Sequence, residues 1–81
     1  MKTQFFPHIT VDQGVQFGKP VMAGTRVPVD VVMGHMAAGD TVETVMEEYA
    51  LSREQVLAAL KYAAKILAEQ TIMVSQHATS Y

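Results

Sequence analysis

The sequence predicts a mainly helical domain with a short N-terminal β-hairpin, three helices in a helix-turn-helix-like bundle and a short C-terminal extended segment. Three of the five glycines and two of the three prolines lie in the first 26 residues, where they indicate turns between short extended pieces. From residue 28 onward, apolar residues recur at helical spacing instead. The 81 residues contain no linker or low-complexity tract, so they are expected to form one domain over residues 1–81.

The β-hairpin is expected within residues 9–26. Ile9-Thr10-Val11 and Val15-Gln16-Phe17 alternate between apolar and polar side chains, as half-buried strands do. Asp12-Gln13-Gly14 between them suits a tight turn. Pro20-Val21-Met22 is interpreted as a further extended segment.

Three helices are expected at about residues 28–38, 41–49 and 52–69. Pro28 suits the first helical position, and Gly39 is a natural stop for the first helix. The expected apolar faces are Val29, Val32, Met33 and Met36, then Val42, Val45, Met46 and Tyr49, and finally Val56, Leu57, Leu60, Ala63, Ala64 and Leu67.

Two capping boxes are predicted at the starts of the later helices. Asp40 would cap the second helix with Glu43 three residues on, and Ser52 would cap the third with Gln55. After the third helix, a β-favouring apolar run predicts an extended segment at 71–75.

Composition excludes several classes of protein. The absence of cysteine excludes disulfides and cysteine-based zinc sites. A net charge of −2 argues against a strongly basic nucleic-acid binder, although residues 1–26 carry three Lys or Arg against one Asp. No apolar stretch approaches the roughly 20 residues of a membrane span, and the first residues lack a signal-peptide core, so a cytoplasmic protein is expected. At 49% hydrophobic, this short chain is expected to cover part of its surface with a second copy or another partner.

The second and third helices have the proportions of a helix-turn-helix. The third would then present side chains to the major groove; the candidates are Arg53, Gln55, Lys61 and Lys65. The alternative to DNA recognition is that the turn only allows two amphipathic helices to pack against each other. Glu43, Glu47 and Glu48 would repel the phosphates, so any DNA binding is expected to be weak and to need a dimer.

One segment is particular enough to indicate a family. It reads GKPVMAGTRVPV over residues 18–29, and AGDTVE over 38–43 and LSREQVLAALKYA over 51–63 follow it. With these motifs the chain resembles the bacterial domain-of-unknown-function 433 family (DUF433), from residue 8 to about 66. The resemblance implies a homeodomain-like, winged-helix-related fold and an antitoxin role in a type II toxin–antitoxin pair, commonly beside a PIN-type ribonuclease toxin. The family often has Tyr-Pro before the third helix, where this chain has Tyr49-Ala50, which leaves that turn less rigid.

The motif itself first indicates structural roles. Gly18 and Gly24 permit turns, and Thr25 can hydrogen-bond the backbone just before the first helix. Arg26 is expected to bind a carboxylate of the acidic helices. The alternative is that Lys19 and Arg26 form an anion site for a phosphate backbone or an acidic partner surface.

No catalytic constellation is present in the sequence, and neither a cofactor nor a metal is expected. His8, His35 and His77 are far apart and lack helical partners, and His35 is interpreted as a boundary residue. The expected function is a non-enzymatic, homodimeric, antitoxin-like protein that binds a cognate toxin and, weakly, operator DNA. A DNA-binding regulator without a toxin and a structural dimerisation module are the alternatives. Self-association is expected through residues 72–74 and exposed parts of the third helix.

Overall fold

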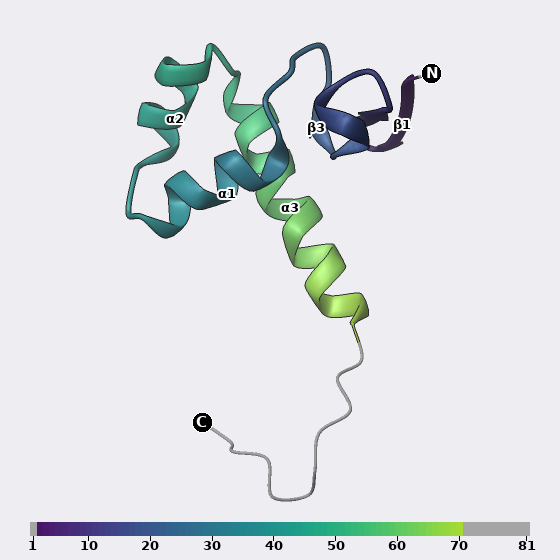
Figure 1. Cartoon of the computed structure of the whole chain (residues 1–81). Coiled ribbons are helices and arrows are strands. Elements are labelled where there is room, and N and C mark those ends of the chain that lie inside the picture. Colours follow the sequence, from purple (N-terminus) through teal and green to yellow (C-terminus); the bar gives the residue numbers. More distant parts are fainter. Residues whose placement is uncertain (1, 71–81) are drawn as a thin grey trace, which may run out of the picture.

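The computed structural model describes residues 2–70, which form a three-stranded sheet and three helices (Figure 1). The elements are β1 (Lys2–Phe6), β2 (Ile9–Asp12), the 3-10 turn η1 (Gln16–Gly18), β3 (Val21–Met22), α1 (Val29–Ala37), α2 (Val42–Tyr49) and α3 (Arg53–Glu69). The predicted fold class, a short N-terminal sheet followed by three helices, is confirmed. The extended segment predicted at 71–75 lies outside the described residues.

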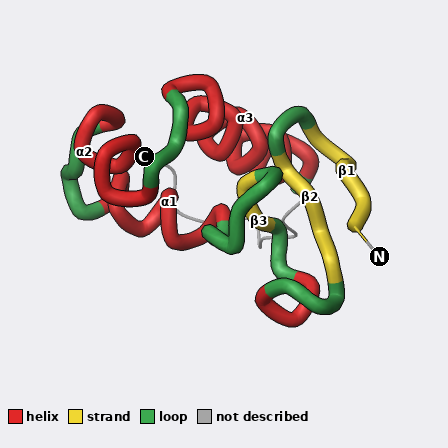
Figure 2. The backbone as a smooth tube through the Cα atoms, turned by 90° about the horizontal axis from the view of Figure 1, so that it is seen from above, coloured by secondary structure: helices red, strands yellow, loops and turns green. Residues whose placement is uncertain are grey.

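The first half of α3 lies at the centre of the molecule, next to the other helices and the sheet. Figures 1 and 2 place α2 and the sheet at opposite ends of the molecule, with α1 and the first half of α3 between them. The second half of α3 extends away from the globule (Figure 1). Among the helices within residues 2–70, none has the length and apolarity that a membrane crossing requires.

The sheet differs from the predicted hairpin. It is antiparallel in the order β1-β2-β3, with Gln4 opposite Thr10 and Ile9 opposite Met22. The expected partner strand at 15–17 is wrong, because the Val15 N–H donates to the Asp12 carbonyl (2.8 Å) and closes a turn directly after β2. The chain then enters η1, and Lys2–Phe6 occupies the place beside β2.

The first helix begins and ends close to the predicted residues. Pro28 lies one position before the helix, and its carbonyl accepts the Val32 N–H (3.4 Å). Gly39 follows the helix with φ of +96°. The Asp40 N–H donates to the His35 carbonyl (3.0 Å) and the Gly39 N–H to the Met36 carbonyl (3.1 Å). This pair of bonds is the Schellman motif, which explains why the chain stops there.

One of the two predicted capping boxes is correct. At the start of α3, Ser52 Oγ accepts the Gln55 N–H (3.1 Å), and Gln55 Oε1 accepts the Ser52 N–H (2.7 Å). The box predicted between Asp40 and Glu43 is wrong. Thr41 caps α2 instead, with its Oγ1 accepting the Thr44 N–H (3.0 Å). The Asp40 carboxylate is unavailable to the helix because it binds His35.

The core lies where the sheet and the three helices meet. It contains one cluster of buried side chains from every part of the fold: Ile9, Met22, Val29, Val32, Val45, Leu51, Val56 and Ala59. The helical faces predicted from periodicity supply four of these residues, namely Val29, Val32, Val45 and Val56. The disagreements are on α3, where Ala58 and Ala59 are buried outside the predicted face, whereas Ala64 and Leu67 of that face are exposed.

Ala50 ends α2 in the left-handed conformation, with φ of +54° and ψ of +44°. A proline, whose φ is fixed near −65°, cannot adopt this turn. An alanine pays a steric penalty there that a glycine does not.

We expect Ala50→Gly to raise the free energy of unfolding by roughly 0.5–1 kcal/mol, because glycine adopts a positive φ freely. Ala64→Gly, at an exposed position inside α3, is the matched control and should lower it by up to about 1 kcal/mol. Urea denaturation of both variants measures the difference. A loss of stability in both variants would contradict the left-handed turn at Ala50.

Candidate functional site

The GTR motif builds the turn that leads from the sheet into α1. Thr25 Oγ1 donates to the Met22 carbonyl (2.7 Å) and accepts the Val27 N–H (3.0 Å), as predicted for this side chain. Gly24 and Gly18 have φ of +78° and +85°, so both glycines are required by the backbone path. Gly18, Gly24 and Thr25 therefore have structural roles.

The two basic residues of the motif behave differently. Lys19 Nζ lies 2.8 Å from Asp30 Oδ2, and both side chains are at least half exposed. Such an exposed pair adds less than about 1 kcal/mol. Arg26 forms no ion pair within residues 2–70, contrary to the predicted bond to a carboxylate of the helices. Its backbone carbonyl accepts a hydrogen bond from Gln16 Nε2 (3.3 Å), and its side chain is exposed.

The structure does not bring the four candidate DNA-binding residues onto one free face. Arg53 Nη1 lies 2.8 Å from Glu43 Oε2, which turns Arg53 toward α2. The pKa of Glu43 lies below its usual value. The larger cause is a hydrogen bond from the Glu43 backbone N–H to its carboxylate, and the second is the hydrogen bond from the Arg53 side chain. Gln55 turns the other way, because residues two apart on a helix point about 200° apart. Besides its capping bond, its Nε2 donates to the Ala23 carbonyl (3.4 Å).

The outer face of α3 is covered near its start by the turn between β1 and β2. Pro7 and His8 of this turn face Leu57, Ala58 and Lys61 across a hollow of about 270 Å³. Ala58 is only 4% exposed, although it lies outside the predicted apolar face of this helix. One turn beyond Lys61, Lys65 Nζ lies 2.5 Å from Glu69 Oε2. The turn between β1 and β2 therefore lies beside the outer face of α3 near its start.

His35 joins α1 to α2, a contact that sequence reasoning missed. Its Nδ1 lies 2.7 Å from Asp40 Oδ2, and its Nε2 lies 2.7 Å from the Tyr49 hydroxyl. Glu48 Oε2 is 3.8 Å from Nδ1. Both ring nitrogens are thus used within the chain. Across the part of the chain that the structure describes, no three His, Asp or Glu side chains are placed to hold a metal ion.

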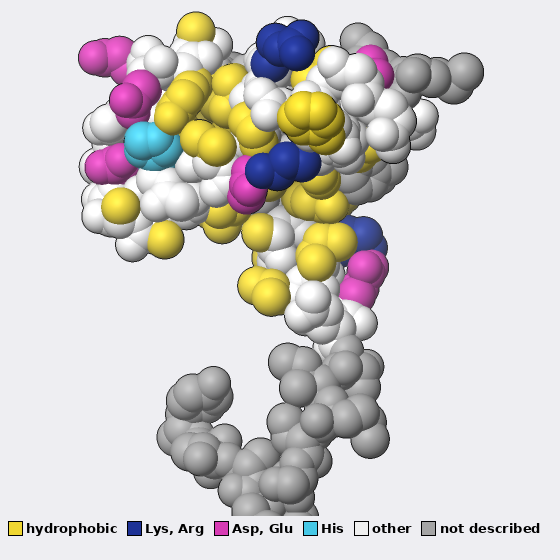
Figure 3. Space-filling model, in the orientation of Figure 1, with side chains coloured by type: hydrophobic (Ala, Val, Ile, Leu, Met, Phe, Trp, Pro, Cys, Tyr) yellow, Lys and Arg dark blue, Asp and Glu magenta, His cyan; other side chains and the backbone are white. Residues whose placement is uncertain are grey.

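An apolar groove of about 420 Å³ lies between α1 and the second half of α3. Leu67 on its wall is 68% exposed and Ile66 is 37% exposed, so the prediction that Leu67 is buried is wrong. Figure 3 shows hydrophobic side chains continuing along this part of α3. The complete lining is Lys19, Pro20, Val29, Asp30, Met33, Tyr62, Ala63, Ile66 and Leu67. No sequence pattern indicates the groove, because it is formed by residues of both α1 and α3.

The sheet, the helices and the GKPV and GTR turns define a small protein with a helix-turn-helix-like bundle. The chain belongs to the family described as "Protein of unknown function (DUF433)", whose model matches residues 9–63. It is also similar to the crystal structure of Rv2018 from Mycobacterium tuberculosis, with 33% sequence identity and a TM-score of 0.60. That similarity covers 64% of this chain and 24% of the other, so this chain matches about a quarter of Rv2018. No curated protein matches the sequence.

We expect Gln55→Ala to lower the free energy of unfolding by about 1–2 kcal/mol, because it removes half of the capping box and the bond to the Ala23 carbonyl. Arg53→Ala should cost less than about 1 kcal/mol, since its ion pair is exposed. Equilibrium denaturation of the two variants measures the difference. An equal loss from both would show that Gln55 has no special structural role.

Proposed function

We propose that this chain is a non-enzymatic protein-interaction domain, an antitoxin-like member of a type II toxin–antitoxin pair. Its partner would be a cognate toxin, and the family resemblance implies a PIN-type ribonuclease. The observation that carries the proposal is the apolar groove between α1 and the exposed end of α3.

The groove has the composition of an interface. Its floor is made by aliphatic side chains such as Val29 and Met33, and the Lys19–Asp30 pair lies at its rim. Protein interfaces combine an apolar centre with a polar rim in this way. An amphipathic helix of a partner fits such a groove, because it can bury a row of apolar side chains against Ile66 and Leu67. Burying one leucine fully contributes roughly 1.5–3 kcal/mol.

Operator DNA has less support as a ligand of α3. Arg53 and Gln55 are hydrogen-bonded within the chain, and the sheet covers Ala58 between them and Lys61. A transcriptional regulator that reads DNA with α3 would have to release these contacts. A structural dimerisation module would use the same groove as an antitoxin, so only the partner separates these two functions.

We expect the free protein to form a homodimer through the exposed end of α3. Sedimentation at micromolar concentration should give about twice the chain mass of 8.9 kDa. Leu67→Asp should weaken the dimer at least about tenfold, because it places a charge in the apolar contact. Ala68→Asp, on the same helical turn but outside the groove, should leave the dimer intact. A monomeric wild-type protein would contradict the dimer.

The proposal predicts that a small nuclease-like protein is encoded immediately beside this gene, and the toxin role is tested with that protein. The purified chain should bind that nuclease and inhibit its RNA cleavage at a molar ratio near one. The double variant Ile66→Asp, Leu67→Asp should lose both effects, whereas Ala64→Asp, Ala68→Asp should keep them, since those two residues lie outside the groove. A wild-type dimer that neither binds nor inhibits the nuclease would instead favour the structural dimerisation module.

A further inference from the structure

Phe17 is held in solvent by a strained turn. Its side chain is 94% exposed, the largest exposure among the described large hydrophobic residues. Gln16, Phe17 and Gly18 all have positive φ, of 52°, 57° and 85°. The first two are left-handed without being glycine, which is unfavourable for a side chain with a Cβ. Such strain persists only where surrounding contacts enforce it, and it is concentrated at functional sites.

The surrounding contacts hold the turn firmly in place. The Gly18 N–H donates to the Val15 carbonyl and the Lys19 N–H to the Gln16 carbonyl, both at 3.1 Å. The Gln16 side chain crosses to the Arg26 carbonyl at 3.3 Å. The backbone on both sides of Phe17 is therefore hydrogen-bonded.

The groups around Phe17 are polar, in contrast to the apolar groove. Gln13, Gly14, Gln16, Phe17 and Arg26 line a hollow of about 480 Å³. An aromatic ring, two amides and a guanidinium group therefore surround one hollow.

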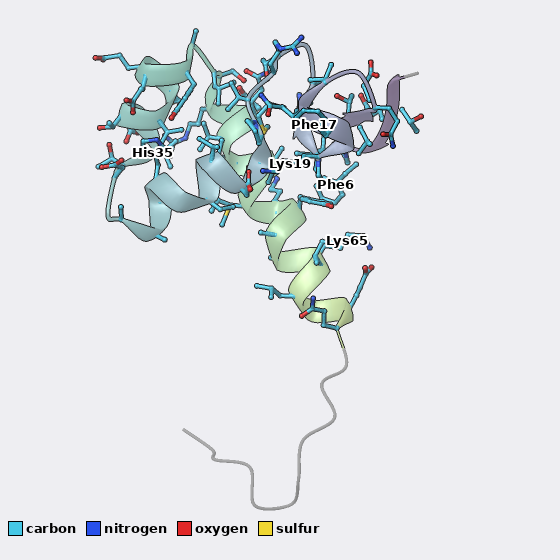
Figure 4. The ribbon with its side chains drawn as sticks, viewed as in Figure 1. Phe6, Phe17, Lys19, His35 and Lys65 are labelled. Carbon is cyan, nitrogen blue, oxygen red and sulfur yellow. The ribbon has the colours of Figure 1, made fainter. Side chains whose placement is uncertain are left out.

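Two cations belong to this surface. Arg26 has no carboxylate partner within residues 2–70. Lys19 is bound only through an exposed pair with Asp30, which a phosphate can replace at small cost. Figure 4 labels Phe17 and Lys19, and in the same view Figure 3 shows basic side chains on two sides of an exposed hydrophobic ring. The nearest acid in sequence, Asp12, accepts the Gly14 N–H (2.8 Å), so it is engaged by the turn itself.

We propose that this turn is a binding site for single-stranded nucleic acid. An unpaired base stacks on the Phe17 ring, the Arg26 guanidinium binds a phosphate, and the Gln13 amide contacts the base edge. Aromatic side chains beside basic groups are the usual means of binding single strands. A base inside a duplex is already stacked and cannot lie on Phe17. A hydrophobic protein anchor is usually set among apolar residues, whereas the other residues that line this hollow are Gln13, Gly14, Gln16 and Arg26.

The three proposed contacts, Phe17, Arg26 and Gln13, lie outside the groove between α1 and α3 that the proposed toxin binding uses, whereas Lys19 lines that groove. The site also differs from the major-groove reading expected of α3, since neither Arg53 nor Gln55 takes part.

The experiment measures fluorescence anisotropy of a labelled oligothymidine of about twelve nucleotides, of the matching oligouridine, and of the same length as a duplex. We expect binding of the single strands that weakens as salt is added. Phe17→Ala should weaken it about tenfold or more, and Phe17→Trp should restore it, because stacking needs only an aromatic face. Arg26→Ala should weaken binding and reduce its salt dependence. Arg53→Ala removes an arginine outside the site and should have no effect.

Three results would overturn the proposal. The first is no binding of either single strand by the wild-type protein, and the second is equal binding by Phe17→Ala. The third is tighter binding of the duplex, which would assign the turn to double-stranded DNA. Toxin inhibition is measured on the same variants. If Phe17→Ala abolishes inhibition and leaves oligonucleotide binding unchanged, Phe17 is a protein anchor and the nucleic-acid site is disproved, whereas the antitoxin role stands.

Discussion

The whole fold depends on the packing around Val56 and Ala59 in the first half of α3. Both side chains are fully buried, and the sheet contributes Ile9 and Met22 to the same cluster. A chain of 81 residues has little apolar interior to share, so one short stretch of helix must serve every other element. Among residues 2–70, no side chains bury the last turns of α3, and Leu67 is exposed there.

Polar side-chain contacts connect elements that the small hydrophobic core does not join by itself. Gln55 connects the start of α3 to the sheet through the Ala23 carbonyl, and His35 connects the ends of α1 and α2. Each of these side chains uses two of its polar atoms within the chain. Gln55, a candidate for DNA recognition, and His35, interpreted as a boundary residue, therefore connect elements of the fold.

The parts of the fold predicted correctly are those decided by neighbours in sequence. The helices follow from apolar spacing, the Ser52–Gln55 cap from residues three apart, and the stop at Gly39 from one glycine. The errors come from competition between possible partners for one polar group. Asp40 is a residue type that caps helices well, but its carboxylate is bound by His35, five residues before it, and residue type alone does not show which partner it takes.

The candidate site was only partly predictable for the same reason. Val15-Gln16-Phe17 alternates as a strand does, yet the bond from Val15 to Asp12 closes the turn before a ladder can form. Local alternation cannot distinguish a half-buried strand from a turn that exposes its aromatic residue. The motif did indicate Lys19 and Arg26 as candidate site residues. Which of the two forms an ion pair depends on where α1 places Asp30.

The exposed last turns of α3 also affect how quickly proteases degrade the protein. Helical turns without tertiary packing open readily, and proteases cleave chain that has opened. Occupation of the groove would hold Ile66 and Leu67 against another surface and keep these turns helical. A free chain would then be degraded from this helix while a bound chain is spared, so that the amount of the protein follows the amount of its partner.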